Sequence, residues 1–216
     1  MNHLPNALTA LRLVLSLFVF FALAVAGQVD GLDRDTRFLL VRLALAAFVV
    51  AAVTDFFDGW LARRYGAVSV AGAILDPIAD KVLICAAILG LLALTEVPAF
   101  IIPAALILFR EFAVSALREV AAGRNVKLPV TLLAKWKTTF QLVALAALML
   151  TAAWPAYSLP ANPNLWIGAL LTAYGLFWIA CLVTLVTGAQ YAAQAWRALG
   201  GQNQDTRPAR EPPQAL

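Results

Sequence analysis

The chain alternates long apolar runs with short polar breaks. A run of about 20 apolar residues is long enough to cross the hydrocarbon core of a bilayer as an α-helix. Six runs reach this length, at residues 5–26, 38–63, 72–94, 98–121, 132–153 and 164–193. The pattern therefore predicts an all-α fold, an integral membrane bundle of six transmembrane helices.

Composition supports a membrane protein. Hydrophobic residues make up 62% of the 216 residues, which exceeds the usual share in a soluble domain. The first run contains Arg12 and is not followed by a small-residue cleavage site, so we interpret it as a retained helix and not a signal peptide. We expect one membrane domain over residues 1–199 and a disordered cytoplasmic tail over 200–216, which is rich in Gln, Pro and Arg.

The distribution of basic residues predicts the orientation in the membrane. Cytoplasmic loops of membrane proteins carry an excess of Lys and Arg. If both termini are cytoplasmic, thirteen of the sixteen Lys and Arg residues lie on that side, and the exceptions are Arg34, Arg37 and Arg42. The net charge of +4 is then a topology signal, and we expect no nucleic-acid partner.

Four carboxylates lie close together in this apolar chain. Asp55 and Asp58 are three residues apart and Asp76 and Asp80 are four apart, so each pair shares one helix face. A single Asp at mid-bilayer costs about 3 kcal/mol even on lenient insertion scales. A shared cation would offset this penalty. Because all the ligands are oxygens, the cluster suits a hard divalent ion such as Mg²⁺ or Mn²⁺.

Small residues and one arginine accompany the carboxylates. Gly59, Ala62 and Gly72 leave room for a flat group to approach the helix backbone. Arg63 adds a cation whose fork geometry matches phosphate oxygens. The surroundings therefore predict a phosphate-bearing ligand at the metal.

A second group of charges follows the fourth run. Arg110, Lys135 and Lys137 lie at the ends of two neighbouring predicted helices, where we expect them to face the aspartates, and Arg118 lies between them along the chain. Such a cluster would bind an anionic co-substrate, for which glycerol phosphate is a small candidate. Two alternatives stay open: Arg110 forms a local ion pair with Glu111, and Arg118 is a topology charge.

Polar residues also mark the start of the first run. Asn6, Thr9 and Arg12 follow one another at intervals of three and share a loose helix face. The residues either contact a substrate or serve as a helix cap and as hydrogen-bond partners between helices.

The aspartate segment matches a known signature. Residues 55–80 read D-x2-D-G-x2-A-R-x8-G-x3-D-x3-D, which resembles the signature of the CDP-alcohol phosphotransferase family at every specified position. Residues 5–12, 110–118 and 134–138 further resemble the branch of this family that forms phosphatidylglycerophosphate. The resemblance extends from about residue 4 to about residue 190.

This resemblance implies an activity. A phosphatidyl group would pass from CDP-diacylglycerol to sn-glycerol 3-phosphate, with CMP as the second product, at the cytoplasmic face of a bacterial inner membrane. Asp80 would be the general base, two Mg²⁺ or Mn²⁺ ions would bind the aspartates, and the protein would be a homodimer. The implied site residues are Asp55, Asp58, Asp76 and Asp80 for metal; Asn6, Thr9, Gly59, Ala62, Arg63 and Gly72 for the nucleotide and pyrophosphate; and Arg110, Arg118, Lys135 and Lys137 for glycerol phosphate.

Other functions remain to be weighed. A relative within the family could use inositol phosphate, serine or phosphatidylglycerol as the acceptor. A cation transporter would also carry intramembrane carboxylates, but it predicts repeat symmetry, which the sequence lacks, and leaves the Gly, Ala and Arg spacing unexplained. A non-catalytic membrane scaffold would need no set of four aspartates.

Overall fold

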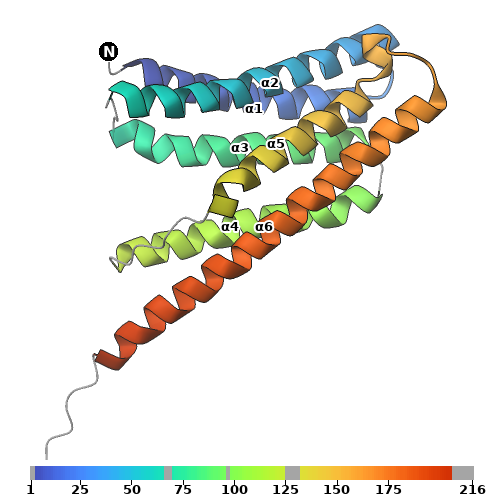
Figure 1. Cartoon of the computed structure of the whole chain (residues 1–216). Helices are drawn as coiled ribbons and strands as arrows, with labels where there is room; N and C mark the ends of the chain where they lie inside the picture. Colours follow the sequence, from blue (N-terminus) through green and yellow to red (C-terminus); the bar gives the residue numbers. More distant parts are fainter. Residues whose placement is uncertain (1–2, 66–69, 96–97, 125–131, 206–216) are drawn as a thin grey trace, which may run out of the picture.

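The structure is a computed structural model that describes residues 3–65, 70–95, 98–124 and 132–205, without the side chains of 3–6, 56–74, 76, 98, 132–135 and 199–205. This part of the chain folds into six α-helices and one short 3₁₀ helix, with no strand among the described residues. The elements are α1 (His3–Gln28), α2 (Arg34–Tyr65), α3 (Val70–Leu94), α4 (Pro98–Gly123), α5 (Leu132–Ala152), η1 (Pro155–Tyr157) and α6 (Pro163–Asp205) (Figure 1).

The six predicted apolar runs are confirmed as helices. In the described residues, α1, α2, α3, α4 and α6 each contain a stretch long and apolar enough to cross a membrane. The apolar part of α5, Trp136–Ala152, is shorter than this length. Helix α6 continues to Asp205, so residues 200–205 of the expected tail belong to a helix, while 206–216 lie outside the described residues.

Two groups of helices make up the bundle (Figure 1). Helix α1 packs between α2 and α3, and the long helix α6 crosses α5 and α4. Apolar side chains fill the interior, and the rings of Phe100 on α4 and Phe177 on α6 stack with centroids 4.8 Å apart. Many other apolar side chains point outward, as a lipid-facing surface requires.

Small residues bring α1 and α3 into close contact. A Cβ at Gly27 would overlap the backbone of Ala93 and Leu94, and a Cβ at Gly90 would lie 2.8 Å from Leu23 Cδ1. Glycine at these positions lets the helices approach closely, which is how helices associate in lipid, where apolar surface alone provides little driving force. Gly27 lies fifteen residues beyond Arg12 on α1, so this contact is about 22 Å along the helix from that arginine.

Asp33 fixes the start of α2. Its Oδ2 accepts a hydrogen bond of 2.9 Å from the backbone N–H of Thr36, the arrangement of a helix N-cap. Hydrogen bonds from the side chain and then the backbone of Thr36 lower the pKa of the exposed Asp33 carboxyl. The lowered pKa keeps this cap ionised to a lower pH than an isolated Asp carboxyl.

Candidate active site at one end of the bundle

Arg12 joins two of the predicted metal ligands. Its Nη1 lies 2.7 Å from Asp55 Oδ1 and 2.9 Å from Asp80 Oδ1. Arg12 is fully buried, whereas the two aspartate side chains are 34% and 40% exposed. Carboxylates from α2 and α3 thus converge on one point that remains open to solvent.

The packing order of the helices explains this convergence. Helix α1 lies between α2 and α3, so a side chain on α1 can reach both neighbours. Asp55 lies in the later part of α2, and Asp80 lies in the first half of α3. Both therefore come beside the first half of α1, where Arg12 lies. Arg12 holds these carboxylates together, and Ser16 Oγ donates a hydrogen bond to the Arg12 carbonyl oxygen over 2.7 Å.

The donor set of this point fits a hard divalent cation. Carboxylate oxygens are the preferred ligands of Mg²⁺ and Mn²⁺, and Asp55 and Asp80 already meet around a positive charge. The side chains of Asp58 and Asp76 lie outside the described set. Among the side chains that are described, no three His, Cys, Asp or Glu residues come together as a metal site.

A polar cavity opens beside Asp80. Its volume is about 160 Å³, and it receives side chains from α3, α4, α5 and α6. Three of the four cations predicted to bind glycerol phosphate line this cavity together with Asp80, and the fourth, Lys135, has no described side chain. The full lining is Pro77, Asp80, Lys81, Ile84, Arg110, Glu111, Val114, Ser115, Arg118, Lys137, Thr138 and Tyr191.

Glu111 connects the cations of this cavity. Its Oε1 accepts hydrogen bonds from Lys137 Nζ at 2.6 Å, from Arg110 Nη1 at 3.2 Å and from Gln141 Nε2 at 3.3 Å. The alternative of an ion pair between Arg110 and Glu111 is therefore confirmed, but Lys137 of α5 joins it. Because Arg110 and Glu111 are buried, removal of Glu111 would leave the Arg110 charge out of water without its carboxylate partner, whereas removal of Arg110 leaves Glu111 paired with Lys137.

Helix α6 supplies partners that the sequence analysis missed. Thr187 Oγ1 accepts a hydrogen bond of 2.9 Å from Arg110 Nη2, and Thr184 Oγ1 accepts one of 2.8 Å from Gln141 Nε2. The Tyr191 hydroxyl accepts one of 2.8 Å from Arg118 Nη2. Spacings of three and four place these polar residues on one face of an apolar helix, which is the signal that could have found them.

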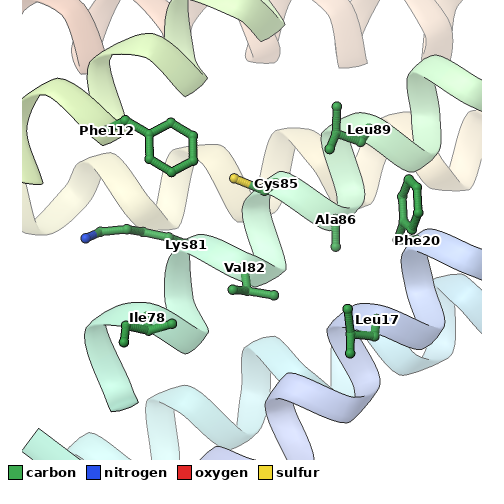
Figure 2. A pocket seen from close by; sticks show the side chains of 9 residues that line it. All are labelled: Leu17, Phe20, Ile78, Lys81, Val82, Cys85, Ala86, Leu89 and Phe112. Atoms are coloured by element: carbon green, nitrogen blue, oxygen red, sulfur yellow. The ribbon is translucent and has the colours of Figure 1, made fainter. Parts of the chain in front are cut away.

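An apolar groove adjoins the polar cavity. It has a volume of about 460 Å³ and is bounded by α1, α3 and α4. Lys81 lines both the groove and the polar cavity, and Figure 2 shows its ammonium group at one end of the groove. The groove residues are Leu17, Phe20, Ile78, Lys81, Val82, Cys85, Ala86, Leu89 and Phe112.

The structure describes the side chains of only some of the predicted site residues. Thr9 is buried on α1, one turn before Arg12. The remaining predicted residues lie on described helices, but their side chains lie outside the description. They are Asn6, Asp58, Gly59, Ala62, Arg63, Gly72, Asp76 and Lys135.

Comparison with known proteins shows which family carries the signature that includes Asp55 and Asp80. Residues 2–186 match the CDP-alcohol phosphatidyltransferase family, which covers most of the chain. The chain belongs to this family. The resemblance seen in residues 55–80 is thereby confirmed, and the match includes α1 to α5 and the first half of α6.

Similar members of the CDP-alcohol phosphatidyltransferase family cover nearly the whole chain. A protein of Cereibacter sphaeroides named CDP-diacylglycerol--glycerol-3-phosphate 3-phosphatidyltransferase is 36% identical over 89% of this chain and 95% of its own length. A protein of Bacillus subtilis with the same name is 34% identical over 94% of this chain and all of its own length. A probable phosphatidylglycerophosphate synthase of Mycobacterium tuberculosis is 36% identical over 94% of this chain and 86% of its own length.

Proposed function

We propose that this protein transfers a phosphatidyl group from CDP-diacylglycerol to sn-glycerol 3-phosphate, forming phosphatidylglycerophosphate and CMP. The observation that carries the proposal is the single cavity that Asp80 shares with Arg110, Arg118 and Lys137. It joins a carboxylate of the family signature to cations that can hold an anionic acceptor. The names of the relatives support the same reaction.

The charge of the cavity favours an acceptor that carries a phosphate. Four cationic side chains and two carboxylates line it, which leaves a formal charge of +2. A phosphomonoester carries a charge of about −1.5 to −2 at neutral pH and would neutralise this excess. Serine has no net charge and phosphatidylglycerol has one negative charge, so both match the cavity less well. Inositol phosphate matches by charge, and the names of the relatives favour glycerol 3-phosphate over it.

The side chains of the cavity suggest how the acceptor reacts. Arg110, Arg118 and Lys137, together with Lys135, bind its phosphate, which brings its free primary hydroxyl toward Asp80. Asp80 accepts the hydroxyl proton while the oxygen attacks the phosphorus that carries the diacylglycerol. The new P–O bond forms as the bond to the CMP oxygen breaks, and CMP leaves.

We assign the metal and nucleotide positions from the signature. Asp55, Asp58, Asp76 and Asp80 would hold two divalent ions, Mg²⁺ or Mn²⁺, as the donor chemistry of the Asp55 and Asp80 pair supports. When bound, such ions neutralise a pyrophosphate and stabilise the charge that develops on the leaving group. Around them Gly59, Ala62 and Gly72 admit the nucleotide, Arg63 faces the pyrophosphate, and Asn6 and Thr9 approach from α1.

The proposed setting is a bacterial inner membrane with the site at its cytoplasmic face. The membrane domain comprises residues 1–199, both termini are cytoplasmic, and the protein is a homodimer. The excess of Lys and Arg on one side supports this orientation. Arg12, Asp55, Asp80 and the polar cavity then lie at the cytoplasmic end of the bundle.

One assay tests the proposed reaction. Purified protein is given CDP-diacylglycerol and radiolabelled sn-glycerol 3-phosphate, and CMP release is followed alongside parallel reactions with inositol phosphate, serine and phosphatidylglycerol. We expect lipid-soluble label and equimolar CMP with glycerol 3-phosphate. Faster turnover with another alcohol would show that this alcohol, and not glycerol 3-phosphate, is the acceptor. No CMP release with any of the alcohols would overturn the transferase assignment.

Loss of one cavity cation should weaken use of the acceptor selectively. We expect Arg110→Ala to lower kcat/KM for glycerol 3-phosphate by roughly ten- to a hundred-fold, since a charge-assisted hydrogen bond contributes about 1.5–3 kcal/mol. The KM for CDP-diacylglycerol should change little. Arg124→Ala serves as the matched control, because Arg124 is exposed at the end of α4 and does not line the cavity. Equal kinetics for the two variants would exclude Arg110 from acceptor binding.

The orientation has its own test. In a variant lacking Cys85 and Cys181, single cysteines at Asp33 and Gln202 should react with a membrane-impermeant maleimide from opposite sides. We expect Asp33→Cys to be labelled from outside in intact cells and Gln202→Cys only after the membrane is opened, because the basic residues predict an inner C-terminus. Labelling of Gln202→Cys in intact cells would reverse the proposed topology.

A further inference from the structure

One face of α6 contacts the cation network of the polar cavity. We call Thr184, Thr187, Gly188 and Tyr191 the α6 face. Thr187 binds Arg110, Tyr191 binds Arg118, and Thr184 binds Gln141, which in turn contacts Glu111. The match to the family ends at residue 186, one residue before Thr187.

Gly188 provides the space through which Arg110 passes. A Cβ at Gly188 would lie 2.8 Å from Arg110 Cγ and 3.0 Å from Arg110 Nε. The stem of Arg110 therefore lies directly on the backbone of α6. Beyond this crossing its guanidinium reaches Thr187 and Glu111 at hydrogen-bonding distance. Because Arg110 is buried, the surrounding side chains leave little room for it to shift.

Tyr191 restrains the more exposed cation. Its ring is buried, and the Arg118 guanidinium carbon lies 4.9 Å from the ring centroid, within the range of a cation–π contact. The Tyr191 hydroxyl accepts a hydrogen bond from the same guanidinium. The aromatic ring is fixed by packing, so an exposed and otherwise mobile arginine acquires a defined position beside the cavity.

We propose that the α6 face positions Arg110 and Arg118 and thereby sets the affinity of the cavity for a phosphate-bearing acceptor. This inference rests on the proposed function and names the residues that hold its acceptor site in shape. Cations fixed before binding lose less conformational freedom when the phosphate arrives, which favours binding. The residues of the α6 face are positioning residues, because they act through the arginines.

Gly188→Ala tests whether the close passage of Arg110 over Gly188 matters, and Gly175→Ala is its matched control. Both substitutions add one methyl group to α6, but a Cβ at Gly175 meets nothing within 4 Å. We expect Gly188→Ala to raise the KM for glycerol 3-phosphate at least about ten-fold, since a displaced Arg110 would lose charge-assisted hydrogen bonds to the phosphate that are worth about 1.5–3 kcal/mol. The KM for CDP-diacylglycerol should change less than about two-fold, and Gly175→Ala should behave as the wild type.

Two milder variants keep the test valid if Gly188→Ala folds poorly. Thr187→Val preserves shape but removes the hydroxyl that accepts from Arg110, and Thr187→Ser restores an acceptor. We expect a rise of about ten-fold in the KM for glycerol 3-phosphate with Val and recovery with Ser. Tyr191→Phe should act in the same direction through Arg118 while it retains the ring. Unchanged KM values in all these variants would overturn the proposal.

A binding measurement separates this inference from the proposed reaction. Calorimetric titration of the full-length protein with inorganic phosphate probes the cations without any turnover. If wild type and Gly175→Ala bind phosphate and Gly188→Ala binds it at least about ten-fold more weakly, the α6 face positions the cations whatever alcohol is used. Equal phosphate binding by all three proteins would overturn the inference, while glycerol 3-phosphate turnover by the wild type would still support the reaction.

Discussion

Asp80→Asn should lower kcat with glycerol 3-phosphate by at least about 100-fold, because general-base help is typically worth about 10² to 10⁴ in rate. The amide keeps the size of the side chain and loses its basicity and charge. Asp55 still pairs with Arg12 in this variant, so the α1–α2 contact has a remaining charged partner. The KM for glycerol 3-phosphate should change less than kcat, since Arg110 and Lys137 are intact.

The measurement is steady-state turnover with CMP release as the readout. Asp33→Asn is a suitable control, because it changes a carboxylate to an amide at the start of α2, far from the polar cavity. Wild-type kcat in Asp80→Asn would exclude Asp80 as the base and would leave the binding role of the neighbouring cations unaffected.

Chelation should have the largest effect. We expect EDTA to abolish turnover and Mg²⁺ or Mn²⁺ to restore it, because Asp55 and Asp80 converge on one point and Asp58 and Asp76 belong to the same signature. Carboxylates gathered without enough positive charge repel one another and are poorly solvated. Arg12 supplies one positive charge to two carboxylates, so the group of four aspartates has capacity for further cations.

Metal binding can be measured apart from turnover. Mn²⁺ titration followed by electron paramagnetic resonance should report binding to the wild type and weaker binding to Asp55→Asn, with Asp33→Asn again as the control. Full turnover in EDTA, together with metal analysis that finds no bound ion, would remove the divalent ions from the mechanism.

The helices could be predicted from the sequence because lipid imposes a simple rule. Backbone groups in a bilayer must be satisfied within the segment, so long apolar runs become helices regardless of their partners. All six runs did so, with ends within a few residues of the prediction except at α6. There the helix continues through residues 200–205, although Gly200, Gly201 and the Gln residues favour disorder by composition.

The charged residues of the site could be predicted from the sequence, because a charge in an apolar chain needs a reason. The uncharged polar residues of α6 were missed. Asp80, Arg110 and Lys137 stand out in an apolar chain and meet in one cavity. Threonine and tyrosine are common in membrane helices, so the spacing of Thr187 and Tyr191 on one helix face is a weaker signal than a buried charge. Their partners lie more than 70 residues away in the chain, and that pairing follows only from the crossing of α6 over α4.

The partners of Arg12 could not be predicted from the sequence, for a different reason. Its place within the first apolar run was visible, but its partners were not, because Asp55 and Asp80 stand out first as a motif of their own. The contact depends on α1 lying between α2 and α3, an arrangement that hydrophobic periodicity does not specify. Charge pairs of this kind are therefore a property of helix order and packing.

The pairing of Arg12 has a consequence for synthesis of the chain. The first helix leaves the ribosome with an arginine that ends up fully buried, and its two carboxylate partners follow 43 and 68 residues later. A buried arginine is better accommodated with its carboxylate partners than without them, so we expect the insertion of α2 and α3 to stabilise α1. We therefore expect the first three helices to stabilise one another during membrane insertion, since the carboxylate partners of Arg12 lie on α2 and α3.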